Sequence, residues 1–282
     1  MKRFVRLVKL LFLLFFTVLA IRGFFSFFGR EKVKEAIYIL KLEDTILSSE
    51  KIVNDLRNLE KNDFVKAIIL RINSPGGTIG ASQEIYLELK RFKEKTGKKL
   101  VCSIENVGAS GAYYVSLACD KVIALPGSVV GSIGVISFFF TVEDLLKYLK
   151  VKPYIVKSGK FKDTGSPFRQ PNEQDIKYLE DIVLKLFEQF KKDVVEVRPA
   201  LKDKIDEIAD GRVFTGKEAL ELGLIDHIGT FSDAVTLAKE LAGIKEEPKL
   251  IFPEKRKIPF LDDILKSTKE EIISKFLFPQ VM

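Results

Sequence analysis

Short apolar runs alternate with amphipathic segments from Ala36 onward, and this alternation constrains the fold of the chain more than any other feature. Runs of four to six apolar residues are typical of buried strands, and apolar residues spaced three or four apart are typical of helices. Such alternation predicts an α/β fold. Strands are predicted at 37–40, 67–72, 100–104 and 121–125, and helices at 51–59, 85–96 and 112–118, the second ending at Gly97.

The second half of the chain predicts further helices from their capping residues. Asn172 is expected to begin a long helix that ends before Pro199, and Thr215 begins a short helix that Gly223 closes. Ser232 is predicted to cap another helix, which ends at Gly243. We therefore expect one catalytic domain over residues 31–245, followed by a C-terminal helical extension over 246–282.

The N-terminus carries basic residues before an unbroken apolar run from Leu10 to Ile21. If Arg22 reaches the interface, the segment from Leu7 to Phe28 is long enough to cross a bilayer as a signal anchor, so residues 1–30 are predicted to be a transmembrane helix. A signal peptide cleaved after Ala20 is the alternative. In both cases the positive N-terminal flank predicts a single-pass protein of the cytoplasmic membrane whose catalytic domain is extracytoplasmic.

Composition excludes several classes of function. The net charge is +7, but lysine and glutamate are interleaved without a dense basic tract, so no nucleic-acid partner is expected. Cys102 and Cys119 are expected to be buried free thiols, with one bridge between them left open, and no metal or organic cofactor is predicted. The sole histidine, His227, lies in an apparent helix-exit turn, which argues against a Ser-His triad.

Two glycine-rich turns, Asn73–Gly77 and Gly108–Gly111, each follow a predicted strand and precede a predicted helix. Their glycines allow sharp turns and leave backbone N–H groups available for an anion. Ser110 stands in the second turn, where it is either a nucleophile or a plain helix cap. A lysine is the available base, because burial disfavours its charged form, but composition does not select which lysine.

Five motifs follow one another along the chain: Ser74-Pro-Gly-Gly77, Ala109-Ser-Gly-Ala-Tyr-Tyr114, Gly131-Ser-Ile-Gly134, Lys157-Ser-Gly-Lys-Phe-Lys-Asp163 and Asp210-Gly-Arg-Val-Phe-Thr-Gly-Lys217. In this order they resemble the motifs of the signal peptide peptidase A family. The resemblance covers residues 36–245 and matches the short form of the family, which has one catalytic domain.

This resemblance implies a serine protease with a Ser-Lys dyad. It assigns the nucleophile to Ser110 and the general base to Lys162, with Lys160 as the rival. The oxyanion hole falls on the backbone N–H groups of Gly77 and Gly111, and Ser132 orients the lysine.

The resemblance also implies a fold and partners. The fold is the crotonase and Clp-protease type of stacked ββα units, and the assembly is a homo-oligomer of about eight subunits with active sites shared between neighbours. The substrates implied are hydrophobic peptides, chiefly remnant signal peptides, cut at a lipid membrane. Alternatives are a protease of stomatin-like membrane proteins, a catalytically silent membrane scaffold and a crotonase-type acyl-coenzyme A enzyme.

Overall fold

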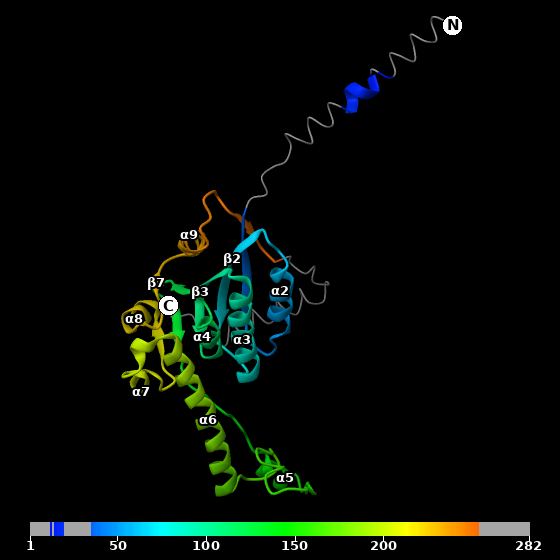
Figure 1. Ribbon diagram of the computed structural model, residues 1–282. Helices are drawn as coiled ribbons and strands as arrows, with labels where there is room; N and C mark the ends of the chain where they lie inside the picture. The colour runs from blue at the N-terminus through cyan, green and yellow to red at the C-terminus, as the bar shows by residue number, and fades with distance from the viewer. Residues whose placement is uncertain (1–11, 13, 20–34, 254–282) are drawn as a thin grey trace, which may run out of the picture. The chain divides into compact units, whose positions relative to one another are not determined.

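The computed structural model describes residues 12, 14–19 and 35–253, and its centre is an eight-stranded mixed sheet (Figure 1). The strand order is β6-β5-β3-β2-β1-β8, with β4 pairing with β3 and with β7. The strands are β1 (Ala36–Glu43), β2 (Val65–Ser74), β3 (Lys99–Ala109), β4 (Lys121–Ala124), β5 (Val129–Gly131), β6 (Val213–Thr215), β7 (His227–Ile228) and β8 (Lys249–Ile251). The helices are α2 (Glu50–Glu60), α3 (Ile79–Thr96), α4 (Gly111–Ser116), α5 (Glu143–Tyr148), α6 (Glu173–Val197), α7 (Ile205–Ile208), α8 (Gly216–Leu222) and α9 (Phe231–Leu241), with a 3₁₀ turn at Pro199–Leu201.

Both faces of the sheet are covered, which explains why β2 and β3 are apolar almost throughout. Successive side chains of a strand point to opposite faces. Leu70 and Cys102 therefore belong to the cluster that packs against α2, α3 and α4, while Ile69 and Val101 pack against α9. All pairs in the sheet are parallel except β5 with β6. The carboxyl ends of β2 and β3 consequently open at the same edge, beside α4.

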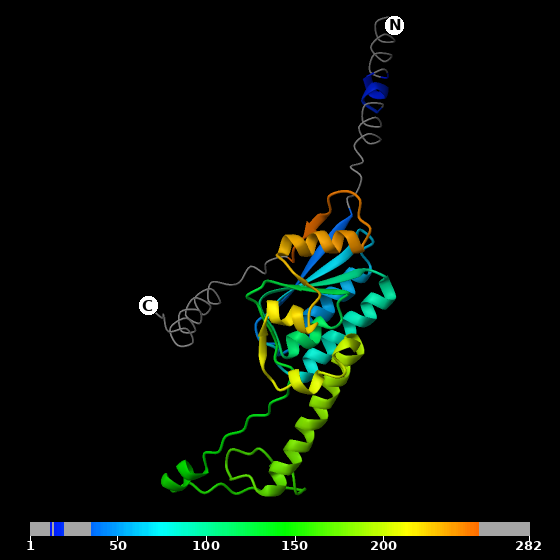
Figure 2. The same cartoon turned by 90° about the vertical axis from the view of Figure 1, so that its left-hand side faces the viewer.

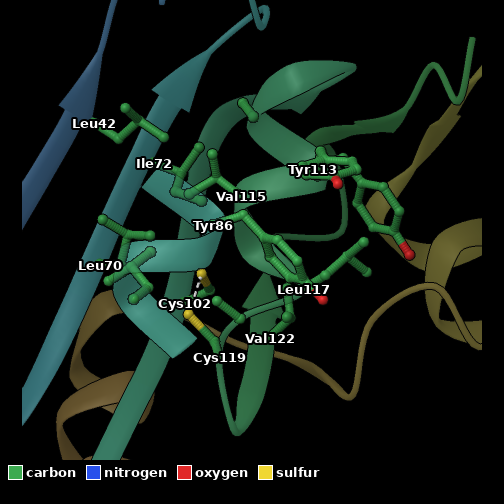
Figure 3. Close-up of a cluster of buried hydrophobic side chains, with 14 of the residues drawn as sticks. Leu42, Leu70, Ile72, Tyr86, Cys102, Tyr113, Val115, Leu117, Cys119 and Val122 are labelled. Carbon is green, nitrogen blue, oxygen red and sulfur yellow. Dashed lines mark hydrogen bonds between the residues drawn. The ribbon is translucent and has the colours of Figure 1, made fainter. Parts of the chain in front are cut away.

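The two cysteines lie in the core below α4 (Figure 3). Cys102 on β3 and Cys119 after α4 are both buried free thiols, and their Sγ atoms are 2.6 Å apart. Burial, followed by the contact with Cys119, raises the pKa of the Cys102 thiol. Tyr113 is also buried there, and its hydroxyl donates to the carbonyl of Leu224, 2.9 Å away. The helix that follows Ser110 is thus held by a dry, closely packed support.

Residues 135–172 and the first half of α6 form an arm that extends from the sheet (Figures 1 and 2). In both views α5 lies near the N-terminal end of α6, away from the sheet. Its apolar side chains are exposed in the single chain. Val156, Tyr154 and Ile136 are 100%, 90% and 88% exposed. Exposed apolar surface on this scale marks a surface that binds something apolar.

Most of the predicted elements are confirmed, with two kinds of difference. Asn172 caps α6 and Thr215 caps α8, each in a capping box, and Gly97 ends α3 in the left-handed conformation. The cap of α9 was predicted wrongly, because Thr230 rather than Ser232 holds that place in a capping box with Asp233. The short elements β5, β6, α5, α7 and β8 were not predicted. Of these, β8 lies within residues 246–282, which were expected to be a helical extension, and it pairs with β1 instead.

The predicted anchor lies largely outside the described residues, as does the predicted helical pattern beyond residue 253. Among residues 12, 14–19 and 35–253, no helix is both long and apolar enough to span a bilayer.

Candidate active site

Ser110 occupies a sharp turn between β3 and α4. Its N–H donates to the carbonyl of Gly131, 2.8 Å away, and its carbonyl accepts from the N–H of Tyr114 at 2.9 Å. The backbone angles are φ 52° and ψ −123°, a conformation that residues with a side chain rarely adopt. Strain of this kind costs about 1–3 kcal/mol and persists only where the surroundings impose it. The turn therefore holds the serine hydroxyl in one place.

The turn after β2 packs directly against Ser110. A Cβ atom built on Gly76 would lie 2.7 Å from the backbone nitrogen of Gly111 and 3.0 Å from Cβ of Ser110, so only glycine fits there. The neighbouring Gly77 is confined as well, because a Cβ atom on it would lie 2.1 Å from the carbonyl oxygen of Ile46. The two glycine-rich turns of the sequence thus meet at one point.

The backbone N–H groups of Gly77 and Gly111 are both available at this point. Ile46 donates to the carbonyl of Gly76 and accepts from Thr78, both at 2.8 Å, so the N–H of Gly77 points away from Ile46. Gly111 is the first residue of α4, and its N–H has no acceptor within that helix. A Cβ atom on Gly111 would lie 3.3 Å from the nitrogen of Gly77. Two unused donors beside a serine hydroxyl form the arrangement of an oxyanion hole.

Ser132 is held next to Ser110 by the antiparallel pair β5 and β6. Its N–H donates to the carbonyl of Arg212 at 2.8 Å, and the N–H of Gly211 donates to the carbonyl of Ile133 at 3.1 Å. Like Ser110, Ser132 has a positive φ of 52°. Within the Asp210–Lys217 motif, the backbone of Gly211 and Arg212 therefore fixes the turn that carries Ser132.

Ser110 lines two neighbouring hollows, both with largely apolar walls. The smaller lies between Gly77 and Gly111 on one side and Tyr114, Leu186 and Phe190 on the other. The larger is an open groove of about 590 Å³, which Ser132 also lines together with Val135, Ile136, Val183, Leu184 and Phe187. The groove can hold an extended apolar segment against the serine.

Tyr114 lines the smaller hollow, and its role there was not predicted beyond its place in a motif. Its ring packs against Tyr86 and Phe190, with centroids 5.0 and 4.9 Å away, and its hydroxyl donates to the carboxylate of Asp193. Burial and then this hydrogen bond raise the pKa of Tyr114 above its usual value. Tyr114 therefore ties α4 to α6 and fixes one wall of the cavity.

No lysine or histidine of residues 12, 14–19 and 35–253 lines either hollow. Lys162 lies in the arm, in the loop before α6, where it is exposed. Its Nζ makes no hydrogen bond or ion pair within the part of the chain that the structure describes. The rival Lys160 lies over the ring of Phe161, 5.2 Å from its centroid.

His227 lies in the short strand β7 rather than in the predicted helix-exit turn, is exposed, and lines neither hollow. Among the described residues, no cluster of three metal-ligating side chains occurs. The structure thus assembles Ser110, Gly77, Gly111 and Ser132 in one place and leaves Lys162 outside it.

The sequence is similar to those of known protease families. The model of the family named "Peptidase family S49" matches residues 92–245, and that of "Clp protease" matches residues 30–130. A relative from Synechocystis sp. is 41% identical over 195 residues, which are 68% of this chain and 69% of that protein. "Serine protease SPPA, chloroplastic" of Arabidopsis thaliana is 30% identical over 83% of this chain, and "Protease 4" of Haemophilus influenzae is 33% identical over 76%. The chain spans only 35% and 36% of the length of these last two relatives.

Proposed function

The chain belongs to peptidase family S49, a family of serine proteases, and from this membership we propose that it is a membrane-anchored endopeptidase that hydrolyses hydrophobic peptides. Remnant signal peptides are the substrate class, because they are apolar by composition. One observation carries the proposal: the strained Ser110 stands beside two free backbone N–H groups at the edge of an apolar groove. The name "Serine protease SPPA" of a relative agrees with it.

The chemistry is acyl transfer through an ester of Ser110. The uncharged amine of Lys162 accepts the proton of the Ser110 hydroxyl, and the freed oxygen attacks the carbonyl carbon of the scissile peptide. The carbonyl oxygen becomes an oxyanion that accepts hydrogen bonds from the N–H groups of Gly77 and Gly111. Lys162 then gives its proton to the leaving amine, and water hydrolyses the ester with Lys162 again as the base. Ser132 accepts a hydrogen bond from the lysine and orients it.

The base in this proposal comes from a neighbouring copy of the chain. Lys162 is exposed on the arm, and no lysine of the described part of the chain lines the groove at Ser110. The exposed apolar side chains of the arm supply a surface through which copies can associate into a ring of about eight subunits. Contact with such a surface excludes water from the lysine, and burial favours the uncharged amine that catalysis requires.

We place the protein in the cytoplasmic membrane, with residues 1–30 as a single-pass anchor and the catalytic domain on the extracytoplasmic side. The apolar run from Leu10 to Ile21 behind four basic residues supports this topology. A ring at the membrane surface gives access to peptides that leave the bilayer and keeps folded proteins from Ser110.

The alternatives differ in substrate or in activity. A protease of stomatin-like membrane proteins would use the same site and differ only in its substrate. A catalytically silent scaffold would not require a strained serine beside two free N–H donors. An acyl-coenzyme A enzyme would bind coenzyme A, which a binding measurement can detect.

The test compares the full-length protein in detergent with Ser110→Ala and Lys162→Ala, using a leucine-rich signal-type peptide. Wild type should cut the peptide, and both variants should be folded but at least about a thousandfold slower, since each lacks a group that acts in the transition state. Lys160→Ala is the matched control and should keep its rate within about threefold. Equal rates in wild type and Ser110→Ala would refute the nucleophile, and full activity of Lys162→Ala would refute the base.

A further inference from the structure

A single arginine joins the Lys162 loop to the start of α6. The Nε atom of Arg169 donates to Oδ2 of Asp163 at 2.8 Å, and Nη2 donates to Oδ1 of the same carboxylate at 3.0 Å. The guanidinium also donates to both oxygens of Asp175, at 2.5 and 3.1 Å. Paired contacts of this kind fix the geometry of both partners. Arg169 therefore clamps the residue after Lys162 onto α6.

The second carboxylate is itself held firmly. Asp175 is 2% exposed and forms the capping box of α6, accepting from the N–H of Asn172 at 3.0 Å. The hydroxyl of Thr164 donates to it at 2.8 Å. Asp163 is 9% exposed and accepts a further hydrogen bond from Lys157 at 2.6 Å. The Lys162 loop is thus bound to the first turn of α6 through Thr164 and through the Arg169 contact with Asp163.

The charges in this cluster cancel. Two cations, Lys157 and Arg169, neutralise two carboxylates, Asp163 and Asp175, so the carboxylate beside Lys162 is fully engaged. Arg169 holds the pKa of both carboxyl groups well below their usual range. Other ionisable groups on the neighbouring elements include Lys160 in the loop, Glu173, Lys177, Tyr178, Glu180 and Asp181 on α6, and Glu143, Asp144 and Lys147 on α5, where Lys147 pairs with both carboxylates. Lys162 is left without a counter-ion among the described residues.

We propose that Arg169 is a positioning residue for Lys162: it fixes the loop on α6 and keeps Asp163 from pairing with the lysine. The inference rests on the proposed function, in which Lys162 is the base. A carboxylate that paired with Lys162 would favour the ammonium form and remove the base from use. By holding Asp163, Arg169 keeps the amine free to enter the groove of a neighbouring copy and to accept the proton of Ser110.

The test is the pH dependence of kcat/KM of the full-length protein in detergent, for wild type and for Arg169→Gln, Asp163→Asn and the double variant. Arg169→Gln should lower kcat about tenfold and leave KM within about twofold, because Arg169 lies outside the groove. It should also move the acid limb of kcat/KM about one unit to higher pH, since the freed Asp163 then pairs with the lysine. Removing that carboxylate as well should return the acid limb to its wild-type position.

The controls separate this inference from loss of folding and from failure of the proposed function. The pH at which the acid limb lies does not depend on the fraction of active protein. If Arg169→Gln unfolds, Arg169→Lys takes its place, and a smaller shift of the acid limb is then expected. Arg91→Gln removes an exposed arginine that also pairs with a carboxylate, and it should leave the profile unchanged. Wild-type kinetics in Arg169→Gln, or an acid limb that the double variant does not restore, would overturn the inference while the protease stands. Full activity of Lys162→Ala would overturn both.

Discussion

At the scale of the residue, Ser110 combines chemistry with backbone strain. Because its φ is 52°, a glycine in its place should relieve strain that an alanine retains. Ser110→Gly is therefore expected to be more stable than Ser110→Ala by about 1 kcal/mol, although both are inactive. Urea unfolding of the two variants measures the difference. Equal stabilities would mean that the turn is not strained.

Gly111 offers a second test at this scale. A Cβ atom there would lie 2.3 Å from Oγ of Ser82, which is itself bonded to the carbonyl of Thr78. Gly111→Ala should lower kcat at least a hundredfold by displacing the oxyanion donors, and it should destabilise the fold by about 1–3 kcal/mol. Gly80→Ala is the matched control, since nothing lies within 4 Å of a Cβ atom there and alanine favours the helix. Similar activity in the two variants would remove Gly111 from the site.

At the scale of the element, a partly buried ion pair joins the end of α6 to β4 and β7. Asp226 accepts from Arg198 at 2.9 Å and from the N–H of Val122 at 2.8 Å. Burial opposes its ionisation, but the hydrogen bond and charge of Arg198 outweigh burial and lower the pKa of Asp226. The resulting stability is present above about pH 4, the usual value for an aspartate, and is lost as the pH falls through the lower value of the folded state.

Asp226→Asn should consequently lower the free energy of unfolding by about 2 kcal/mol at pH 7, because it leaves the Arg198 charge without its partner. The loss should shrink between pH 5 and pH 3, where the wild type itself loses this contribution. Urea unfolding at several pH values measures it. Asp181→Asn, which removes an exposed pair with Lys185, should change stability by less than about 0.5 kcal/mol. A loss that does not depend on pH would contradict the assignment.

The elements that the sequence predicted well are those whose local pattern decides their structure. β2 and α6 carry long apolar patterns, and Asn172 supplies a cap with two hydrogen bonds. By contrast, β5 and β6 have three residues each, and they form strands because they pair with one another across more than eighty residues of chain. The cap of α9 was predicted at Ser232 because a hydroxyl residue at the start of a helical pattern is a common cap, and Thr230, another hydroxyl residue, stands two positions before it. The decisive signal was the aspartate three residues after Thr230.

The candidate site was predictable in its backbone and less so in its base. Glycines after two parallel strands meet at one edge of a sheet, which brings Gly77 and Gly111 to Ser110. Sequence position does not fix how far the side chain of Lys162 lies from Ser110, so their separation within one chain appears only in three dimensions. The hydrogen bonds of Arg169 were not predicted from the sequence either, because its partners Asp163 and Asp175 lie six residues before and six residues after it.

At the scale of the whole molecule, the separation of Lys162 from the groove at Ser110 leads to a prediction about mixed assemblies. Suppose that each active site combines Ser110 of one subunit with Lys162 of the next. A ring that contains both Ser110→Ala and Lys162→Ala subunits then includes sites where both intact residues meet. In random equal mixing these are about one quarter of all sites, since each intact residue is present with a probability of about one half.

The two inactive variants should therefore regain about a quarter of the wild-type activity after co-expression, or after dissociation and reassembly together. Peptide cleavage at fixed total protein measures the gain, and size-exclusion chromatography checks that mixed rings form. The double variant Ser110→Ala/Lys162→Ala mixed with either single variant is the control, because no such mixture contains both intact residues. If mixed rings form and stay inactive, Lys162 acts within its own chain, and the loop that carries it must then reach Ser110 of its own subunit.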